Sequence, residues 1–476
     1  MKKATLIAAA LAVLAGFVGL AWSADAAGPP AVEQPTKIPG NWKIADQPLP
    51  PLKESTARFP YRPVYGLYTW MGEYRTHRDS IKKVGWKSFR VGGPFTDDDM
   101  KMIVADNVEV LKTLGLRDMA GAAGNKKNRA DYDNDEAFIA DYVKGIRAFL
   151  TRYGPEGTFF KDNPTLPKRP IKYIELWNEP NFQYMIPDSN DRKSDEAKRE
   201  ALYAKVMPAA HKAIKADWPA VQVVGFAAGG SSCGDLRFIK NVLAKDPQVA
   251  KSFDVLSTHP YVHGVPPEAD CVRSWGSYSV AKSLDTIRKT LGAHKIAETP
   301  IWYTEVGWPV SKADGGHFDM KGGGLTTPTL QAAYVCRMYA LAIRLGVRRV
   351  HIMFATDTDN FNAGFFLRDK SWRPSAHAVQ NMIKLLPLPD MAQAISDGTD
   401  GYYAYRMFPH ALASMHRNAV IMAWNVEGPK TVAIPVRSDK VKIVDMLGHE
   451  KDAAVADGKV TVEIGPCPIY LIDPIK

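Results

Sequence analysis

Between residues 61 and 390, short β-rich segments alternate with longer segments of helical pattern. This alternation predicts βα units and therefore a parallel sheet with helices on its faces. Eight such strands are predicted: Val64–Trp70, Ser88–Gly92, Arg117–Ala120, Ile174–Trp177, Val221–Phe226, Val255–His259, Trp302–Glu305 and Arg349–Phe354. No other property of the sequence limits the choice of folds as strongly.

The segments between these strands have the length and pattern of amphipathic helices. The predicted helices are Asp98–Leu114, Asp135–Tyr153, Ser194–Asp217, Leu236–Ala244, Val280–Leu291, Leu330–Leu345 and Ala376–Leu386. Eight βα units over about 320 residues favour an α/β fold of the (β/α)8 TIM-barrel type over a doubly wound sheet. No G-x-G-x-x-G sequence follows the first strand, which removes the main support for a dinucleotide-binding sheet.

The pattern changes after Met391 to short β segments separated by turn signals. We expect residues 391–476 to form a small antiparallel β-sandwich. Its predicted strands are Tyr402–Met407, Ala419–Trp424, Thr431–Val436, Lys440–Met446, Lys459–Ile464 and Ile469–Ile472.

The N-terminus has the pattern of a secretory signal. Lys2 and Lys3 precede an apolar or small stretch, and Ala24-x-Ala26 supplies small residues for cleavage after residue 26. We therefore expect residues 1–26 to be a signal peptide and the protein to be exported, to the periplasm or outside the cell. An uncleaved membrane anchor is the alternative, because the apolar stretch approaches the length of a bilayer span. Residues 27–60 are rich in Pro and predict a surface strap or linker.

Composition narrows the function classes only slightly. The chain of 476 residues has 61 Lys and Arg against 51 Asp and Glu, a formal charge of +10. This excess suggests at most an anionic polysaccharide or cell surface as partner; no basic run or nucleic-acid motif supports a nucleic-acid partner.

Of four cysteines, Cys233 and Cys271 lie in loop-like sequence where an exported protein permits a disulfide, with free thiols as the alternative. Cys336 and Cys467 are expected to be small buried side chains.

Two of the predicted strands end in a carboxylate. Strand four runs into Trp177-Asn178-Glu179-Pro180, and strand seven ends at Glu305, followed by Gly307-Trp308-Pro309. The carboxyl ends of barrel strands form the face that carries active sites. Two carboxylates on that face suit glycoside hydrolysis, in which one acts as acid and the other as base or nucleophile. Glu175, inside strand four, is expected to form a structural ion pair instead.

Asn-Glu-Pro at the end of a fourth barrel strand, with a second Glu on strand seven, resembles the clan A glycoside hydrolases. The resemblance covers the region from Tyr61 to about Leu386, together with the small β domain that many members carry. Within the clan, the chain is most similar to the β-xylosidase and α-iduronidase-like branch and to exopolysaccharide endoglycosidases. The resemblance implies a retaining enzyme in which Glu179 is the acid/base and Glu305 is the nucleophile.

The resemblance also implies binding roles for residues around the two acids. Asn178 matches a residue that hydrogen-bonds the sugar 2-hydroxyl, and Arg90 matches an arginine near the nucleophile, a surface ion pair being the alternative. His259 and Tyr261, at the end of strand six, match the positions where the family often has a His or Tyr that orients the nucleophile, although His259 also fits ordinary barrel packing.

Aromatic residues at the predicted rim are candidates for stacking on a sugar. Trp70 and Trp308 lie at such positions. Many clan members place a Trp at the end of strand eight, where this chain has Phe354, so Phe354 substitutes for that platform or the platform comes from elsewhere.

The function expected from the sequence is therefore cleavage of glycosidic bonds in a polysaccharide or oligosaccharide. No cofactor and no metal are expected, because too few oxygen ligands can be assembled for a cation. A non-catalytic polysaccharide-binding or assembly protein built on the same barrel is the alternative. The sequence leaves the sugar, the linkage, endo or exo action and the oligomeric state open.

Overall fold

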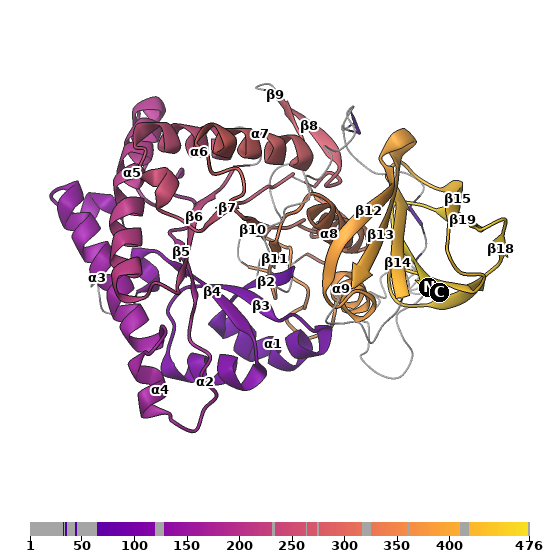
Figure 1. Ribbon diagram of the computed structural model, residues 1–476, viewed down its shortest axis with the longest axis horizontal. Coiled ribbons are helices and arrows are strands. Elements are labelled where there is room, and N and C mark those ends of the chain that lie inside the picture. The colour runs from indigo at the N-terminus through magenta and orange to yellow at the C-terminus, as the bar shows by residue number, and fades with distance from the viewer. Residues whose placement is uncertain are drawn as a thin grey trace, which may run out of the picture.

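A computed structural model describes residues 32, 34, 35, 43–44, 64–119, 128–230, 234–262, 264–273, 276–316, 325–358, 361–409 and 418–474. Eight parallel strands close into a barrel in the order β10-β11-β2-β3-β4-β5-β6-β7 (Figure 1). Their bounds are β2 Tyr65–Trp70, β3 Ser88–Gly92, β4 Glu109–Leu114, β5 Tyr173–Leu176, β6 Gln222–Ala228, β7 Val255–Thr258, β10 Ile301–Val306 and β11 Arg349–Met353. The predicted TIM barrel is confirmed.

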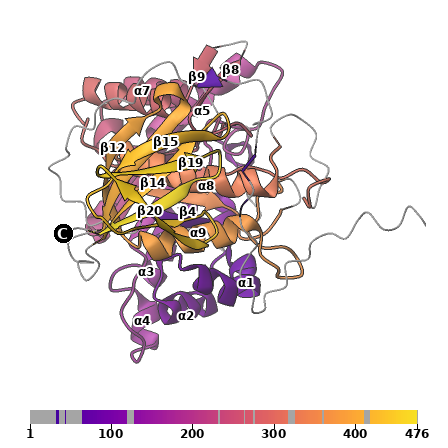
Figure 2. The same ribbon diagram turned by 90° about the vertical axis from the view of Figure 1, so that its right-hand side faces the viewer.

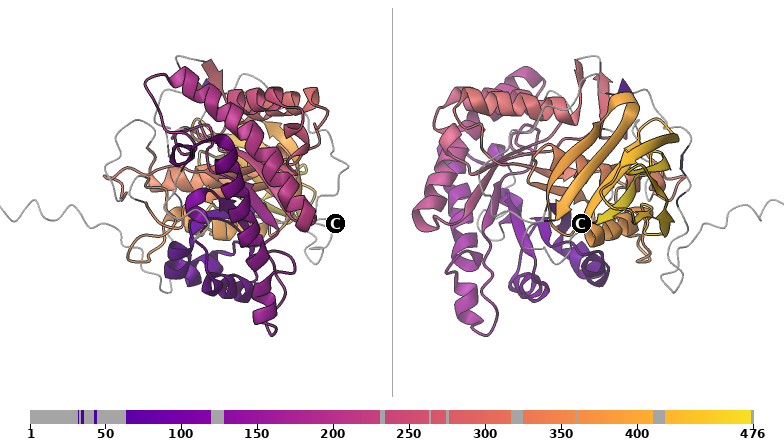
Figure 3. Two further views of the ribbon diagram at one scale, coloured as in Figure 1. Left: turned by 90° about the vertical axis from the view of Figure 1, so that its left-hand side faces the viewer. Right: turned by 45° about the vertical axis from the view of Figure 1, so that its right-hand side comes forward.

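Helices surround the barrel, as Figures 1 and 3 show. They are α1 Met71–Val84, α2 Asp97–Asp106, α3 Asp135–Tyr153, α4 Thr158–Asp162, α5 Arg192–Asp217, α6 Gly234–Lys245, α7 Val280–Ala293, α8 Pro328–Arg344 and α9 Pro374–Leu385. Several begin at a side-chain cap: the hydroxyls of Ser279 and Thr327 accept hydrogen bonds from the first turns of α7 and α8.

The third strand lies earlier in the chain than we predicted. The expected strand Arg117–Ala120 is wrong, and so is the part of the expected helix beyond Asp106. Helix α2 ends where Asn107 adopts a left-handed conformation with φ of 54°, and the apolar run after it forms β4. Residues 109–114 fit a buried strand as well as another helical turn, since periodicity alone does not separate the two in a short apolar run. A short 3-10 turn, Leu116–Asp118, follows β4.

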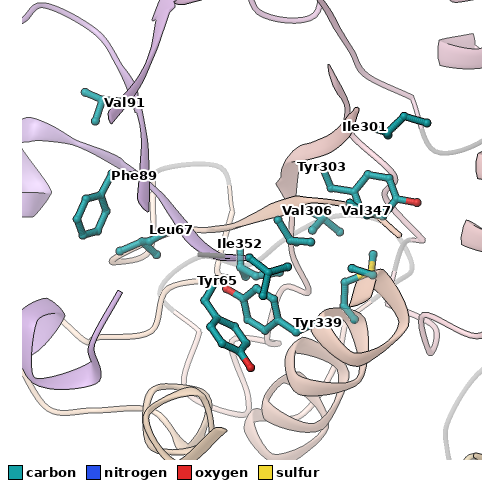
Figure 4. Close-up of a cluster of buried hydrophobic side chains, with 14 of the residues drawn as sticks. Tyr65, Leu67, Phe89, Val91, Ile301, Tyr303, Val306, Tyr339, Val347 and Ile352 are labelled. Atoms are coloured by element: carbon teal, nitrogen blue, oxygen red, sulfur yellow. The ribbon is translucent and has the colours of Figure 1, made fainter. Parts of the chain in front are cut away.

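Two layers of apolar side chains form the core of the barrel. Leu111, Tyr173, Val224, Val255 and Trp302 come from five strands and meet inside it. The opposite faces of the strands pack against the helices. Figure 4 shows part of this layer, including Leu67, Phe89 and Ile352 with Tyr339 of α8. Alternate residues of one strand thus face the two layers, so polar side chains on the inner face near the strand ends point toward the barrel axis.

Residues after α9 form the predicted antiparallel β domain. A six-stranded sheet has the order β12-β13-β14-β20-β16-β17 and a three-stranded sheet the order β15-β19-β18. The strands are β12 Pro389–Asp397, β13 Tyr402–Pro409, β14 Asn418–Asn425, β15 Lys430–Pro435, β16 Val441–Val444, β17 Glu450–Ala453, β18 Val455–Ala456, β19 Lys459–Ile464 and β20 Ile469–Pro474. Ile421, Ile434 and Leu471 pack together between the sheets. The predicted strands are present, and β12, β17 and β18 are additional.

The β domain packs on the barrel over α8 and α9 (Figure 2). Arg337 of α8 is fully buried, donates to Glu268 at 2.9 Å and to the Pro466 carbonyl at 3.1 Å. Arg344, near the end of α8, donates to Asp397 at 2.6 Å. The Arg337–Pro466 hydrogen bond, the Arg344–Asp397 ion pair and the apolar contacts around them join the β domain to the barrel.

Some predicted features fall partly or wholly outside the described residues. These include the signal peptide, most of the strap and Cys233; β8 (Ala269–Arg273) is described, but the side chain of Cys271 is not. Of the strap, β1 (Lys43–Ile44) pairs antiparallel with β8, which in turn pairs with β9 (Gly276–Tyr278). The side chain of Gln34 exchanges two hydrogen bonds of 2.9 Å with the backbone of Cys467. Cys336 and Cys467 are buried free thiols, as expected.

Candidate active site

The guanidinium of Arg90 lies at the centre of a polar cluster at the carboxyl ends of the barrel strands. Arg90 is on β3 and fully buried. Its Nε donates to Glu175 at 2.6 Å, its Nη1 to Glu305 at 2.8 Å and its Nη2 to the Asn178 Oδ1 at 2.6 Å. The ring of Tyr68 lies 4.4 Å from the guanidinium carbon. One cation thus links residues of β3, β5 and β10 and orients them toward the barrel axis.

Glu175 forms an ion pair inside the barrel. Its carboxylate is fully buried and accepts hydrogen bonds from Arg90 and from the Thr113 hydroxyl at 2.8 Å. Burial has the largest single effect and favours the neutral acid, but the Arg90 charge and smaller contributions from other polar neighbours together outweigh it and hold the pKa of Glu175 below its ordinary value. Glu175 therefore anchors Arg90, which is the structural pairing that its position inside the strand predicts.

Glu179 is a buried carboxyl in the turn after β5. Its backbone has φ of 46°, and Trp177 two residues earlier has φ of 71°. Burial raises the pKa of Glu179 to about 7, and the Arg90 charge lowers it only in part. The Nδ1 of the His259 ring lies 3.0 Å from the Glu179 Oε1, within hydrogen-bond distance. Glu179 is thus protonated over much of the range in which an ordinary glutamate is ionised.

Glu305 lies at the end of β10, where the pairing of β10 with β11 shifts register between Tyr303 and Val306. Its Oε2 accepts the Arg90 hydrogen bond, and its Oε1 accepts one from the hydroxyl of Tyr261. Burial and the neighbouring carboxylates raise the pKa of Tyr261 well above its ordinary value, so this hydroxyl remains a donor. A guanidinium and a hydroxyl therefore hold the two oxygens of Glu305 in place.

His259 lies between the two carboxyl groups. Its Nδ1 is 3.0 Å from Glu179 and 3.9 Å from Glu305. One atom from each of these three residues lies within 4.8 Å of the other two, so oxygens of Glu179 and Glu305 face each other at no more than that distance. Burial lowers the pKa of His259 to about 4, which leaves the ring neutral near pH 7. The site thus contains a close pair of acids whose surroundings differ.

The same three side chains are close enough together to bind a cation. Two features of the site oppose the binding of a cation. Arg90 already places a positive charge on Glu305, and Glu179 retains its proton up to about pH 7. A hard divalent cation also prefers about six to eight oxygen ligands, more than two carboxylates and a ring nitrogen offer. The arrangement is better suited to proton transfer than to metal binding.

Aromatic side chains line the cleft beside the acids. Trp70, half-buried at the end of β2, stacks on Phe354 with the ring centroids 4.8 Å apart, and Tyr68 packs against both. A cavity of about 730 Å³ opens here. Its lining includes Tyr68, Trp70, Trp177, Asn178, Gln183 and Tyr184. The structure thus brings Trp70 and Phe354 together, with Trp70 facing the cavity and Phe354 behind it.

Trp308 is not part of this cleft. Its ring is fully buried, and its Nε1 donates to the Val265 carbonyl at 2.9 Å. It packs against Tyr334 of α8. No ring face is therefore open to a sugar, and the expected stacking role is corrected to one in the core. The sequence places Trp308 three residues after Glu305 but does not show that the chain turns inward there.

Two residues that we did not predict hold Glu179 in place. The side-chain amide of Asn181 donates to the Gly229 carbonyl at 2.6 Å and accepts from the Gly229 N–H at 3.0 Å. A Cβ on Gly229 would lie 2.0 Å from the Glu179 Oε1. An added methyl group would displace the Glu179 carboxyl, because the backbone after β6 packs directly on the acid. The Gly229-Gly230 pair after a predicted strand was the available signal.

Comparison with solved structures identifies the class of fold. The barrel with its β domain is the fold of clan A glycoside hydrolases of families 39 and 51. No protein-family model matches the sequence, and a search of curated proteins found no match.

Three of the similar structures illustrate the likeness. A family 39 glycoside hydrolase from Bacteroides cellulosilyticus superposes with a TM-score of 0.64 and 18% identity, over 87% of this chain and 81% of that one. A family 39 β-xylosidase from Caulobacter crescentus gives 0.56 and 14%, over 90% and 98%. A family 51 α-L-arabinofuranosidase from Bifidobacterium longum gives 0.52 and 12%, over 84% and 92%. At these identities the likeness is one of fold.

Proposed function

We propose that the protein is a retaining glycoside hydrolase in which Glu179 is the acid/base and Glu305 is the nucleophile. The observation that carries this proposal is the close pair of carboxyl groups in unlike surroundings. Glu179 is buried beside a neutral histidine with its pKa raised to about 7, whereas Glu305 accepts hydrogen bonds from Arg90 and Tyr261. Unlike environments are what give two neighbouring carboxyl groups different roles in acid–base chemistry.

The spacing of the two acids supports retention of anomeric configuration. Their nearest oxygens are within 4.8 Å. Retaining enzymes hold the two carboxyl groups about 5–5.5 Å apart, whereas inverting enzymes need about 6.5–9.5 Å to admit a water molecule. The shorter spacing leaves room for the anomeric carbon but not for a water between it and the base.

The reaction proceeds in two displacements. Glu305 attacks the anomeric carbon while Glu179 gives its proton to the leaving glycosidic oxygen, which breaks the bond to the aglycone. Glu179, now ionised, takes a proton from water, and the resulting hydroxyl displaces Glu305 and releases the sugar. Formation of the glycosyl ester removes the charge of Glu305, which lowers the pKa of Glu179. Glu179 is then more readily ionised, as its role as a base in the second step requires.

Other residues of the cleft would bind and orient the sugar. Asn178 accepts from Arg90 through its oxygen, so its amide N–H groups are available to a sugar hydroxyl. The half-buried ring of Trp70, backed by Phe354, offers an apolar face on which a pyranose ring can stack. His259 and Tyr261 orient the two carboxyl groups. Trp70 thus takes the place of the strand-eight tryptophan that many clan members have.

The substrate class that fits is a polysaccharide or oligosaccharide. The formal charge of +10 justifies including anionic polysaccharides. The test is a panel of neutral and anionic bacterial and plant polysaccharides, with release of reducing ends as the readout. Wild type should cleave one of them, and E179Q and E305Q should lose at least about 100-fold in rate. E136Q, at an exposed glutamate of α3, is the matched control and should keep full activity.

The alternative is a protein that binds polysaccharide without cleaving it. Such a protein would bind a member of the same panel with no release of reducing ends, and E179Q would not alter the binding. The buried and protonated Glu179 argues against this alternative, since burial of an acid beside its partner serves proton transfer and adds nothing to sugar binding.

We also propose that the protein is exported, with cleavage after residue 26. The basic and apolar pattern of residues 1–26 supports this proposal. Within the described residues, no helix combines the length and apolar character that a membrane span requires.

A further inference from the structure

The carboxyl end of β6 departs from regular strand geometry directly beside Glu179. Phe226 and Ala227 have φ of 80° and 42°, and the pairing of β6 with β7 shifts register between Gly225 and Ala228. Two consecutive non-glycine residues with positive φ are uncommon, because the Cβ then crowds the backbone. A bulge of this kind persists where the surrounding structure holds it.

The hydroxyl of Ser257 holds the middle of this bulge. Ser257 is on β7 and fully buried. Its Oγ accepts from the Ala227 N–H at 2.9 Å and donates to the Gly225 carbonyl at 3.0 Å. The side chain therefore satisfies one backbone N–H and one backbone carbonyl where the strand pairing shifts register.

The hydroxyl of Tyr203 holds the start of the bulge. Tyr203 is on α5, and its hydroxyl accepts from the Phe226 N–H at 2.8 Å and donates to the Leu176 carbonyl at 3.0 Å. Leu176 is the last residue of β5, three positions before Glu179. Tyr203 thus joins the end of the strand that carries the acid to the bulge of the neighbouring strand.

The bulge in turn directs three backbone groups at the acid and its histidine. The Ala227 carbonyl accepts from the Glu179 N–H at 3.0 Å, and the Ala228 carbonyl accepts from the His259 N–H at 2.9 Å. Gly229 follows at once and packs on the Glu179 carboxyl. These two carbonyls point to opposite neighbours, the ends of β5 and β7, as successive carbonyls of a strand do, and the bulge sets the register at which they reach Glu179 and His259.

We propose that this β6 bulge is a positioning device for Glu179, and that Ser257 and Tyr203 are its positioning residues. The inference rests on the proposed function and goes beyond it. Within the described residues, neither hydroxyl bonds to a carboxyl group. Both act through the backbone of residues 225–227. Loss of either hydroxyl leaves a buried N–H of the bulge without its partner, so the bulge relaxes and water reaches Glu179.

The first test uses the dependence on the leaving group. An activated aryl glycoside such as a 2,4-dinitrophenyl glycoside departs without a proton, whereas an unactivated alkyl or saccharide leaving group needs the acid. In S257A and Y203F, kcat/KM for the unactivated substrate should fall about 10- to 100-fold, a part of what general acid catalysis supplies. With the dinitrophenyl glycoside of the same sugar, kcat/KM should stay within about threefold of wild type, since its first step needs no acid.

The second test needs no substrate. Titration of 13C-labelled glutamate, with the Glu179 signal assigned from E179Q, measures the pKa of the acid directly. Water entry should lower the pKa of Glu179 by about one unit in S257A and in Y203F. Y339F is the matched control. The Tyr339 hydroxyl is also buried and donates from a helix, α8, to a barrel-strand carbonyl, that of Gly66, at 2.8 Å, but that bond does not touch the β6 bulge.

The outcomes separate the inference from the proposed function. The inference fails if S257A and Y203F lose activity equally on both substrates, or if the pKa of Glu179 stays within about 0.2 units of wild type, a difference too small to reflect new solvation. If E179Q itself shows no dependence on the leaving group, the proposed role of Glu179 fails instead. If Y339F shows the same effects, the losses in S257A and Y203F reflect general destabilisation of the fold, and the inference is overturned.

Discussion

Arg90 donates from Nη1 to Glu305 and from Nε to Glu175, at 2.8 and 2.6 Å. The cation of β3 therefore lies on the Glu305 side of the acid pair, with Glu175 fixing it from behind. Among the described residues no guanidinium bonds to Glu179, and the neutral ring of His259 lies 3.0 Å from its Oε1. This asymmetry is the physical reason for assigning different roles to two glutamates less than 5 Å apart.

The pH dependence of the reaction should follow Glu179. Burial raises its pKa to about 7, and only the protonated form can donate to the leaving group. We expect kcat/KM for an unactivated substrate to fall as pH rises through about 7, tenfold per pH unit beyond it. A profile of kcat/KM from pH 4 to 9 measures this limb. In a dinitrophenyl substrate the limb should disappear, and its persistence there would assign it to another group.

The same shift predicts a change in stability. The folded-state pKa of Glu179 lies above its unfolded value, so this carboxyl stabilises the fold below about pH 4.5, and that contribution is lost as pH rises through about 7. E179Q carries no charge to bury. It should therefore be more stable than wild type at pH 8, by about 1–3 kcal/mol, and close to it at pH 4. Urea unfolding at both pH values tests this, and equal differences at the two would contradict it.

Gly229→Ala should displace the acid without unfolding the protein. The added Cβ would lie 2.0 Å from the Glu179 Oε1, so the carboxyl must move. We expect kcat on an unactivated substrate to fall by about 100-fold, the scale of losing a positioned acid. Gly72→Ala, in α1 with nothing within 4 Å of the added atom, is the control and should keep wild-type kcat. Activity of G229A within threefold of G72A would show that Glu179 does not need this contact.

The buried ion pair between Arg337 and Glu268 should govern the stability of the whole chain. Glu268→Gln leaves the fully buried Arg337 without its counter-charge. Breaking one side of a buried pair costs about 3–5 kcal/mol. Thermal unfolding should show one transition at lower temperature, because Arg337 also donates to Pro466 of the β domain. E450Q, at an exposed pair with Lys442, is the control, and two separate transitions would mean that the domains unfold independently.

Trp70 and Trp308 should respond differently to substitution. Trp70→Ala removes a half-buried face of the cleft, so KM should rise by about tenfold, in line with the loss of one aromatic contact. Trp308→Phe keeps a buried ring but loses the bond to Val265, so it should lower the free energy of unfolding by about 1–3 kcal/mol and leave KM unchanged. Kinetics and urea unfolding of both variants test this. A raised KM in W308F would instead show that Trp308 contributes to substrate binding.

Sequence patterns predicted the barrel and the meeting of Glu179 and Glu305 on one face because both depend on local signals. Each acid closes an apolar run, and the strand ends of a parallel barrel meet on one face. The strand at residues 109–114 was missed because its apolar run continues the helical pattern of α2, and only the left-handed Asn107 separates them. Trp308 was misplaced because exposure depends on tertiary packing.

The β6 bulge beside Glu179 lay beyond sequence reasoning for a different reason. Phe226 and Ala227 give no sign of a positive φ, since both fit an ordinary strand. Ser257 and Tyr203 lie on different elements, and only the closed barrel brings their hydroxyls to the same bulge. Contacts between residues far apart in sequence that correct a local irregularity leave no periodic signal.

Covalent trapping tests the central claim most directly. A 2-deoxy-2-fluoro glycoside of the cleaved sugar, with a dinitrophenyl leaving group, slows the second displacement and lets the glycosyl-enzyme accumulate. Peptide mass spectrometry after inactivation should then locate one added fluoroglycosyl group on Glu305. A label on any other residue, or turnover with inverted product and no label, would contradict a retaining mechanism with Glu305 as the nucleophile.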